Sequence, residues 1–245
     1  NLLVVNQGID ILFYDMRTLV SNKKPKPLGR YSDVHSDQVT QLAFSPTNPN
    51  ILISGAEDGL IGVYALDAVE AEEAVASILN TDCPVSKIGF FGNNYEGVYS
   101  LSTVETSTLW HFPSAQRISS FQNIREQTNM DYLVDCIYEN GNGQLYMMIG
   151  NHEGHSQLVI VNPNAIEEYS NIMNYNNTTM RCVCAPLQLN QGGLTTLYTG
   201  GEDGKINLLK QGDPATAVSN SNQRASVEIG AARVQVTKKN RYSPY

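Results

Sequence analysis

The sequence predicts an all-β protein made of repeated antiparallel hairpins. Residues 51–64 and 196–209 carry nearly the same pattern, in which an apolar run, a Ser/Thr-Gly step and an Asp-Gly turn lead into a second apolar run. An Asp-Gly pair between apolar stretches predicts a hairpin, because both residues tolerate the positive φ angles of tight turns. With 245 residues, of which 41% are apolar, the chain can bury a substantial core.

Three further hairpins follow the same plan, at residues 2–15, 98–111 and 145–162. The ends of the five final strands lie about 50 residues apart, at Tyr14, Tyr64, Trp110, Val161 and Leu209. An apolar strand precedes four of the hairpins, at residues 39–44, 85–91, 133–138 and 180–185. Three strands, with a fourth in the linker, repeated every 50 or so residues, are typical of the blades of a β-propeller.

The composition of the connecting segments and of the last residues predicts how the chain is organised. The Ala/Glu-rich segment 66–78 predicts a short helical turn, and the Asn-rich segment 162–179 predicts an irregular connection. We therefore expect residues 1–210 to form a partial propeller of four to five blades. The composition then changes to Ser, Asn, Ala and Gln, so we expect residues 211–245 to be a tail with a basic end, either flexible or pinned along the surface.

The overall charge restricts the classes of partner. The formal net charge is −8, which repels nucleic acids and anionic membranes and favours a basic partner. The chain has no apolar run of about 18 residues and no cationic leader, so we expect an intracellular protein of the nucleus or cytoplasm. Cys182 and Cys184 stand two positions apart, and we expect them to be reduced and packed as small hydrophobic side chains.

The repeated segments resemble those of WD-repeat proteins. In that family a His, a Ser or Thr, an Asp and a Trp form a hydrogen-bonded structural tetrad in each blade. The second unit matches these positions with His35, Ser54, Asp58 and Tyr64, where Tyr replaces Trp. In the last unit Thr199 and Asp203 match, whereas Leu209-Lys210 replaces the family's Trp-Asp and no His precedes Met180.

The resemblance also implies a closed ring. In the WD-repeat proteins that these segments resemble, several blades precede the position that corresponds to Asn1. The resemblance therefore implies part of a seven-bladed propeller whose first blades are absent from this chain. An open propeller would leave sheet edges free to pair with other chains.

The sequence offers little catalytic chemistry, and we predict no catalytic residue, no cofactor and no metal site. His152 and His155 have a spacing that metal ligands use, but they fall on a hairpin turn without an evident third ligand. His35, Ser54 and Asp58 also match the composition of a catalytic triad. The structural interpretation is a buried relay that ties the hairpin turn of a blade to its strands.

The turn acids give a sharper functional hypothesis. In a propeller, all hairpin turns of this type lie on one rim. The acids expected there as a partner-binding rim are Asp33, Asp37, Glu57, Glu105, Glu153 and Glu202. Together they would attract a Lys/Arg-rich peptide, although Asp and Glu in turns also occur simply as turn formers and solvated side chains.

The sequence therefore favours a non-catalytic scaffold or adaptor that holds a protein partner as a subunit of a complex. Two alternatives remain open. One is a propeller enzyme or enzyme accessory with a site in the central channel, and a convergent His/Asp/Glu cluster there would reveal it. The other is a nucleic-acid-associated propeller that uses the basic tail from Arg224 to Arg241.

Overall fold

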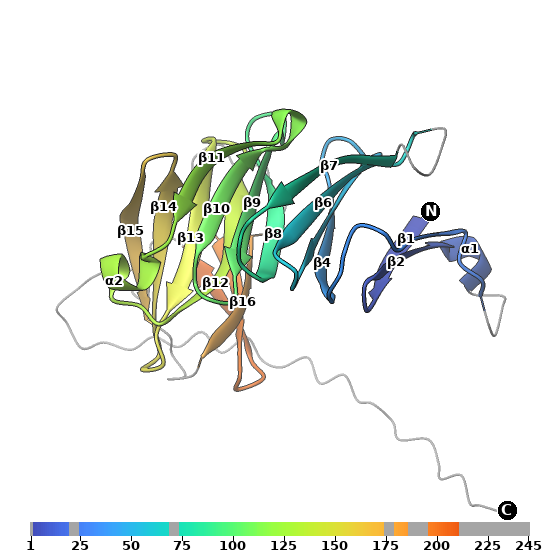
Figure 1. Ribbon diagram of the computed structural model, residues 1–245. Coiled ribbons are helices and arrows are strands. Elements are labelled where there is room, and N and C mark those ends of the chain that lie inside the picture. The colour runs from blue at the N-terminus through green and yellow to red at the C-terminus, as the bar shows by residue number, and fades with distance from the viewer. Residues whose placement is uncertain (1, 20–24, 69–73, 174–178, 186–195, 211–245) are drawn as a thin grey trace, which may run out of the picture.

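Five antiparallel sheets make up the described part of the chain. The computed structural model describes residues 2–19, 25–68, 74–173, 179–185 and 196–210 (Figure 1). The sheets follow one another in chain order, and each is built from consecutive strands. The predicted all-β propeller architecture is therefore confirmed, while the predicted tail at 211–245 lies outside the described residues.

The sheets have these strands. The first holds β1 (Leu2–Gln7), β2 (Asp10–Asp15) and β3 (Gly29–Tyr31). The second holds β4 (Val39–Phe44), β5 (Ile51–Ala56), β6 (Leu60–Ala65) and β7 (Val75–Asn80). The third holds β8 (Val85–Phe91), β9 (Gly97–Ser102), β10 (Ser107–His111) and β11 (Gln116–Phe121). The fourth holds β12 (Tyr132–Glu139), β13 (Gln144–Gly150), β14 (His155–Asn162) and β15 (Ala165–Met173). The fifth holds β16 (Met180–Cys184), β17 (Thr196–Gly201) and β18 (Ile206–Lys210).

The helices that the structure describes are short and lie between strands. They are α1 (Met16–Leu19), α2 (Ile124–Thr128) and a 3-10 helix (Phe112–Ser114). No helix among the described residues has the length and apolar character needed to cross a membrane.

The first strands of neighbouring sheets contact one another, β4 with β8, β8 with β12, and β12 with β16. These strands are therefore innermost, and the later strands of each sheet lie further out. The innermost strands share an irregularity, because the register shifts by one residue near the start of each. The shifts fall between Val39 and Gln41, Val85 and Lys87, Leu133 and Asp135, and Met180 and Cys182. A bulge bends a strand and increases its twist. The four innermost strands therefore share this local bend as well as their position in the sheet.

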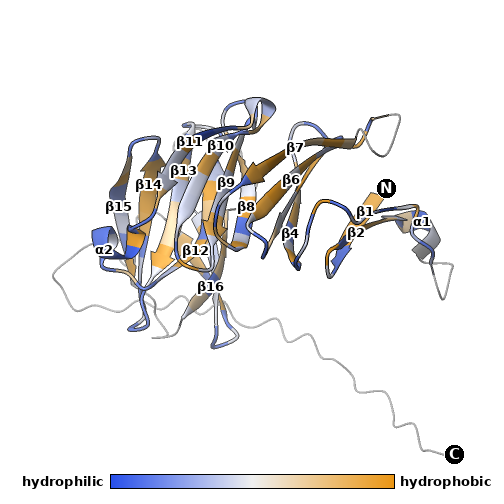
Figure 2. Ribbon diagram, in the orientation of Figure 1, coloured by the Kyte–Doolittle hydropathy of each residue, from blue (hydrophilic) through white to orange (hydrophobic). Residues whose placement is uncertain are grey.

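The hydrophobic core is divided into four clusters between consecutive sheets. Ile11 and Phe13 of the first sheet pack with Val39, Leu52 and Tyr64 of the second. The three other clusters join the second and third, third and fourth, and fourth and fifth sheets in the same way. Figure 2 shows the hydrophobic colour concentrated along the strands. Each sheet thus depends on its neighbours for burial, as expected for stacked repeats.

Two predictions about the linkers and cysteines are wrong. Residues 165–173 form the nine-residue outer strand β15, because main-chain pairing with β14 overrides the weak Asn-rich pattern. Cys182 and Cys184 do share one face of β16, but both are exposed, since their face points away from the fourth sheet. The predicted helical turn at 66–78 falls partly outside the described residues, and β7 begins at Val75.

Candidate functional site: a tetrad-organised rim

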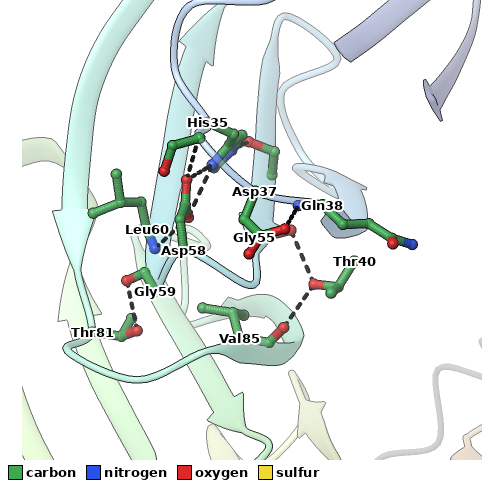
Figure 3. A network of polar contacts seen from close by, with 12 residues as sticks. His35, Asp37, Gln38, Thr40, Gly55, Asp58, Gly59, Leu60, Thr81 and Val85 are labelled. Carbon is green, nitrogen blue, oxygen red and sulfur yellow. Dashed lines mark hydrogen bonds and ion pairs between the residues drawn. The ribbon is translucent and has the colours of Figure 1, made fainter. Parts of the chain in front are cut away.

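A buried polar relay organises the turn between β5 and β6. The Nδ1 atom of His35 lies 3.2 Å from a carboxylate oxygen of Asp58, and its Nε2 atom lies 2.6 Å from the Ser54 hydroxyl. The Ser54 hydroxyl lies 3.1 Å from the Tyr64 hydroxyl, which completes the tetrad. Figure 3 shows His35 over Asp58, beside the loop that enters β4.

Asp58 also binds two backbone N–H groups in addition to His35. Its carboxylate accepts the backbone N–H groups of Ser36 at 2.8 Å and Leu60 at 2.9 Å. The first bond fixes the loop before β4, and the second closes the hairpin turn. One carboxylate therefore connects two chain segments that are more than 20 residues apart, and the tetrad is a device for holding a turn against a loop.

Tyrosine replaces tryptophan in this sheet because Gly62 makes room for it. A Cβ atom at Gly62 would lie 2.7 Å from the Tyr64 hydroxyl and 2.9 Å from the Ser54 hydroxyl. In the third sheet the corresponding residue is Thr108, whose hydroxyl contacts that of Ser100 and accepts the Trp110 indole N–H at 3.1 Å. A threonine hydroxyl there takes the place that the Tyr64 hydroxyl occupies in the second sheet.

The tetrad has the residue types of a catalytic triad but is sealed from solvent. Ser54 and Tyr64 are both 0% exposed, and His35 is 4% exposed. Burial lowers the pKa of His35 below its ordinary value, although Asp58 acts in the opposite direction. Burial also raises the pKa of Tyr64 to about 12. Because a nucleophile must reach its substrate, this arrangement fits a structural relay.

The last sheet retains only part of the motif. Thr199 is buried, and the Asp203 carboxylate accepts the Lys205 backbone N–H at 3.1 Å, as Asp58 does with Leu60. Asp203 therefore acts as a turn former. No histidine precedes β16 at the position of His35, so Thr199 and Asp203 lack the residue that would connect them.

Backbone hydrogen bonds place the hairpin turns on one rim. The turns between β1 and β2, β5 and β6, β9 and β10, and β17 and β18 each bond to a segment that enters an innermost strand. These bonds include Val39 to Gly8, Glu57 to Gln38, Thr81 to Gly59, Thr103 to Pro84, and Glu202 to Thr179. The turns and the entering loops thus form a continuous rim around the innermost strands.

The predicted rim acids have different surroundings. Asp33, Asp37, Glu57 and Glu153 are exposed, and none of them forms an ion pair with another described residue. Glu202 is also exposed, but it pairs with Arg181. Glu105 is half-buried and pairs with Arg125. Neither arginine could be predicted as a partner from local sequence, because both pairs join residues about 20 positions apart.

The innermost strands carry few ionisable side chains. Lys87 of β8 and Asp135 of β12 form an ion pair at 3.8 Å, and the buried Tyr99 hydroxyl donates to Asp135 at 3.2 Å. Burial raises the pKa of Asp135, against the influence of its hydrogen bonds and of Lys87. No histidine occurs in β4, β8, β12 or β16. No group of three or more His, Cys, Asp or Glu side chains among the described residues could hold a metal ion.

Successive antiparallel sheets whose first strands lie innermost define a β-propeller fold, and the His-Ser-Asp-Tyr tetrad resembles that of WD-repeat proteins. Comparisons with curated proteins confirm the resemblance to WD-repeat proteins, whereas no protein-family model matches the sequence. WD repeat-containing protein 89 homolog of Dictyostelium discoideum is 25% identical over 233 residues, which cover 92% of this chain and 62% of that protein. WD repeat-containing protein GTS1 of Arabidopsis thaliana is 28% identical over 258 residues, which cover 100% of this chain and 64% of that protein.

A third relative is an uncharacterized WD repeat-containing protein of Saccharomyces cerevisiae, 31% identical over 137 residues, which cover 53% of this chain and 33% of that protein. The chain thus spans less than two thirds of the length of these relatives. Among solved structures, a propeller chain of the mitotic checkpoint complex is similar in fold. Its TM-score is 0.63 and its identity 12%, over 84% of this chain and 58% of that chain.

Proposed function

We propose that this protein is a non-catalytic scaffold that holds a protein partner, and in particular a Lys/Arg-rich segment, on the tetrad-organised rim. The observation that carries the proposal is the set of exposed rim carboxylates without an ion-pair partner among the described residues, namely Asp33, Asp37, Glu57 and Glu153. Repeat folds commonly use such continuous surfaces for binding.

The rim suits this role because its backbone is held in place before a partner arrives. Asp58 fixes the turn that carries Glu57 and also the loop that carries Asp37, through the Leu60 and Ser36 amides. A preorganised surface loses less conformational entropy on binding than a loose one. The net charge of −8 adds a long-range attraction for basic segments.

A peptide-binding measurement tests the proposal. A fluorescent Lys/Arg-rich peptide is titrated with the protein at low salt, with a Glu-rich peptide as a specificity control. The rim variant carries Asp37→Lys, Glu57→Lys and Glu153→Lys, which leaves the residues in ion pairs untouched. At a separation of about 8 Å in water, each reversal removes on the order of 1 kcal/mol of attraction, so we expect affinity to fall by at least about tenfold.

The matched control reverses three exposed acids at the opposite ends of the sheets, Asp67, Glu167 and Glu168. It changes the net charge equally but leaves the rim intact. Equal weakening by both triple variants would show that only net charge matters and would refute a rim site. Unchanged binding by the rim variant would refute it as well.

We also propose that the protein acts in the nucleus or cytoplasm. Imaging of a fluorescently tagged protein in cells tests this, and a signal confined to the secretory pathway would contradict it.

A further inference from the structure

The hairpin turns contain pairs of residues that can react with their own backbone. The nitrogen of one residue can attack the side-chain carbonyl carbon of a preceding Asn or Asp, and glycine favours this because it has no Cβ atom to hinder the approach. The sequence has four Asn-Gly or Asp-Gly pairs, all in turns between strands, at residues 58–59, 140–141, 142–143 and 203–204. Hydrogen bonds to the glycine nitrogen and to the side chain determine which pair can react.

Three of the four glycine N–H groups are held by main-chain carbonyl groups a few residues earlier. They are Gly59 to Ala56 at 3.2 Å, Gly143 to Glu139 at 2.9 Å, and Gly204 to Gly201 at 3.2 Å. In the part of the chain that the structure describes, no group accepts the N–H of Gly141, which is exposed. The Gly141 nitrogen can therefore approach a neighbouring carbonyl carbon without first losing a hydrogen bond within the protein.

The two asparagines of the turn between β12 and β13 also differ in their side chains. The Asn142 Nδ2 atom donates to the hydroxyl of the buried Tyr146 at 2.9 Å. The Asn142 Oδ1 atom accepts the backbone N–H of Gln144 at 3.0 Å. Asn140 forms no hydrogen bond with any residue that the structure describes. Both asparagines are exposed, so hydrogen bonding, and not access to water, distinguishes them.

We propose that Asn140 is a site of spontaneous deamidation and that the fold protects Asn142. The Gly141 nitrogen forms a bond to Cγ of Asn140, the bond between Cγ and Nδ2 breaks, and ammonia leaves with the proton of the Gly141 N–H. Water then opens the cyclic imide. Addition of water at the Cγ carbonyl gives aspartate, and addition at the main-chain carbonyl gives isoaspartate. The only co-reactant is water.

Either product adds a negative charge to the turn between β12 and β13. This turn lies at the opposite end of the fourth sheet from the turn that carries Glu153, because neighbouring strands are antiparallel. The site is therefore independent of any partner that binds the rim. Isoaspartate also adds a carbon atom to the main chain, beside the Glu139–Gln144 pair at the end of the ladder between β12 and β13. We expect it to weaken strand pairing there.

Mass spectrometry of the complete chain after incubation at mildly alkaline pH tests the proposal. Peptide mapping measures deamidation at each asparagine, and electron-transfer fragmentation separates isoaspartate from aspartate. Because the hydrogen bonds of Gly143 and of the Asn142 side chain must break before Asn142 reacts, we expect Asn140 to deamidate at least about tenfold faster. A synthetic peptide of residues 138–144 contains both pairs without the fold and should deamidate at similar rates at both positions.

Two variants test the two parts of the proposal separately. Gly141 is not among the glycines with positive φ, so Gly141→Ala is compatible with the turn, and its Cβ atom should slow deamidation of Asn140. Tyr146→Phe removes one hydrogen bond of the Asn142 amide and should raise the Asn142 rate by about fivefold while the Asn140 rate stays the same.

Four results would each overturn the proposal. They are equal rates for Asn140 and Asn142 in the folded chain, the same ratio of rates in the peptide as in the chain, an Asn140 rate that Gly141→Ala leaves unchanged, and an Asn142 rate that Tyr146→Phe leaves unchanged.

Discussion

Replacing Asp58 by alanine should destabilise the fold more than any substitution of an exposed rim acid. The Asp58 side chain is only 5% exposed and accepts hydrogen bonds from His35, Ser36 and Leu60. Its removal leaves the Nδ1 atom of the buried His35 without its partner and frees the loop before β4. At about 1 kcal/mol for each hydrogen bond, the free energy of unfolding should fall by about 3 kcal/mol.

Thermal unfolding followed by circular dichroism measures this loss. For a chain of this size, 1 kcal/mol corresponds to roughly 2–4 °C, so Tm should fall by roughly 6–12 °C. Asp58→Asn keeps one acceptor oxygen and should lose about half as much. Asp37→Ala is the control, because this exposed carboxylate accepts only the adjacent Gln38 amide, and it should stay within about 0.5 kcal/mol of the wild type. A Tm for Asp58→Ala as high as that of Asp37→Ala would refute the structural role of the tetrad.

Two further substitutions test the same site. Since burial holds the pKa of His35 below 6.5, the unfolded chain binds this proton first, and stability should fall as pH drops through about 6.5. Urea unfolding at a series of pH values should show this part of the decline removed in His35→Gln, and an identical pH profile would contradict it. Gly62→Ala should cost about 1–3 kcal/mol, because the new Cβ would collide with the Tyr64 and Ser54 hydroxyls. Gly29→Ala meets no atom within 4 Å and serves as its control, so equal urea midpoints for the two variants would rule out the close packing around Gly62.

The repeated hairpins were predictable because their turns have strong local chemistry. The Asp-Gly pairs at 58–59 and 203–204 fix the turn type, and the aligned ends of the third strands follow from the spacing. The tetrad partners His35, Ser54, Asp58 and Tyr64 could also be named, because they match the motif of the WD-repeat proteins that the sequence resembles. The structure brings these four side chains together.

Features that depend on neighbouring sheets were not predictable from the sequence. Glu105 has a left-handed φ of 62° without a local mark in the sequence, because the groups that hold its carboxylate are the Leu133 backbone N–H and Arg125 in later elements. The assignment of β15 failed for the same kind of reason, since pairing with β14 decides it. Local sequence therefore determined the turns, whereas contacts between sheets and between strands determined which rim acids stay exposed.

A crystal structure of the protein would test the central claim most directly, which is that successive sheets are radial repeats about one axis. We predict that β4, β8 and β12 line that axis, each with its register shift near the first residue, and that Tyr64, Trp110 and Val161 superpose when one sheet is rotated onto the next. Electron density in which these three side chains occupy unrelated places in their sheets would contradict the propeller and the rim that depends on it.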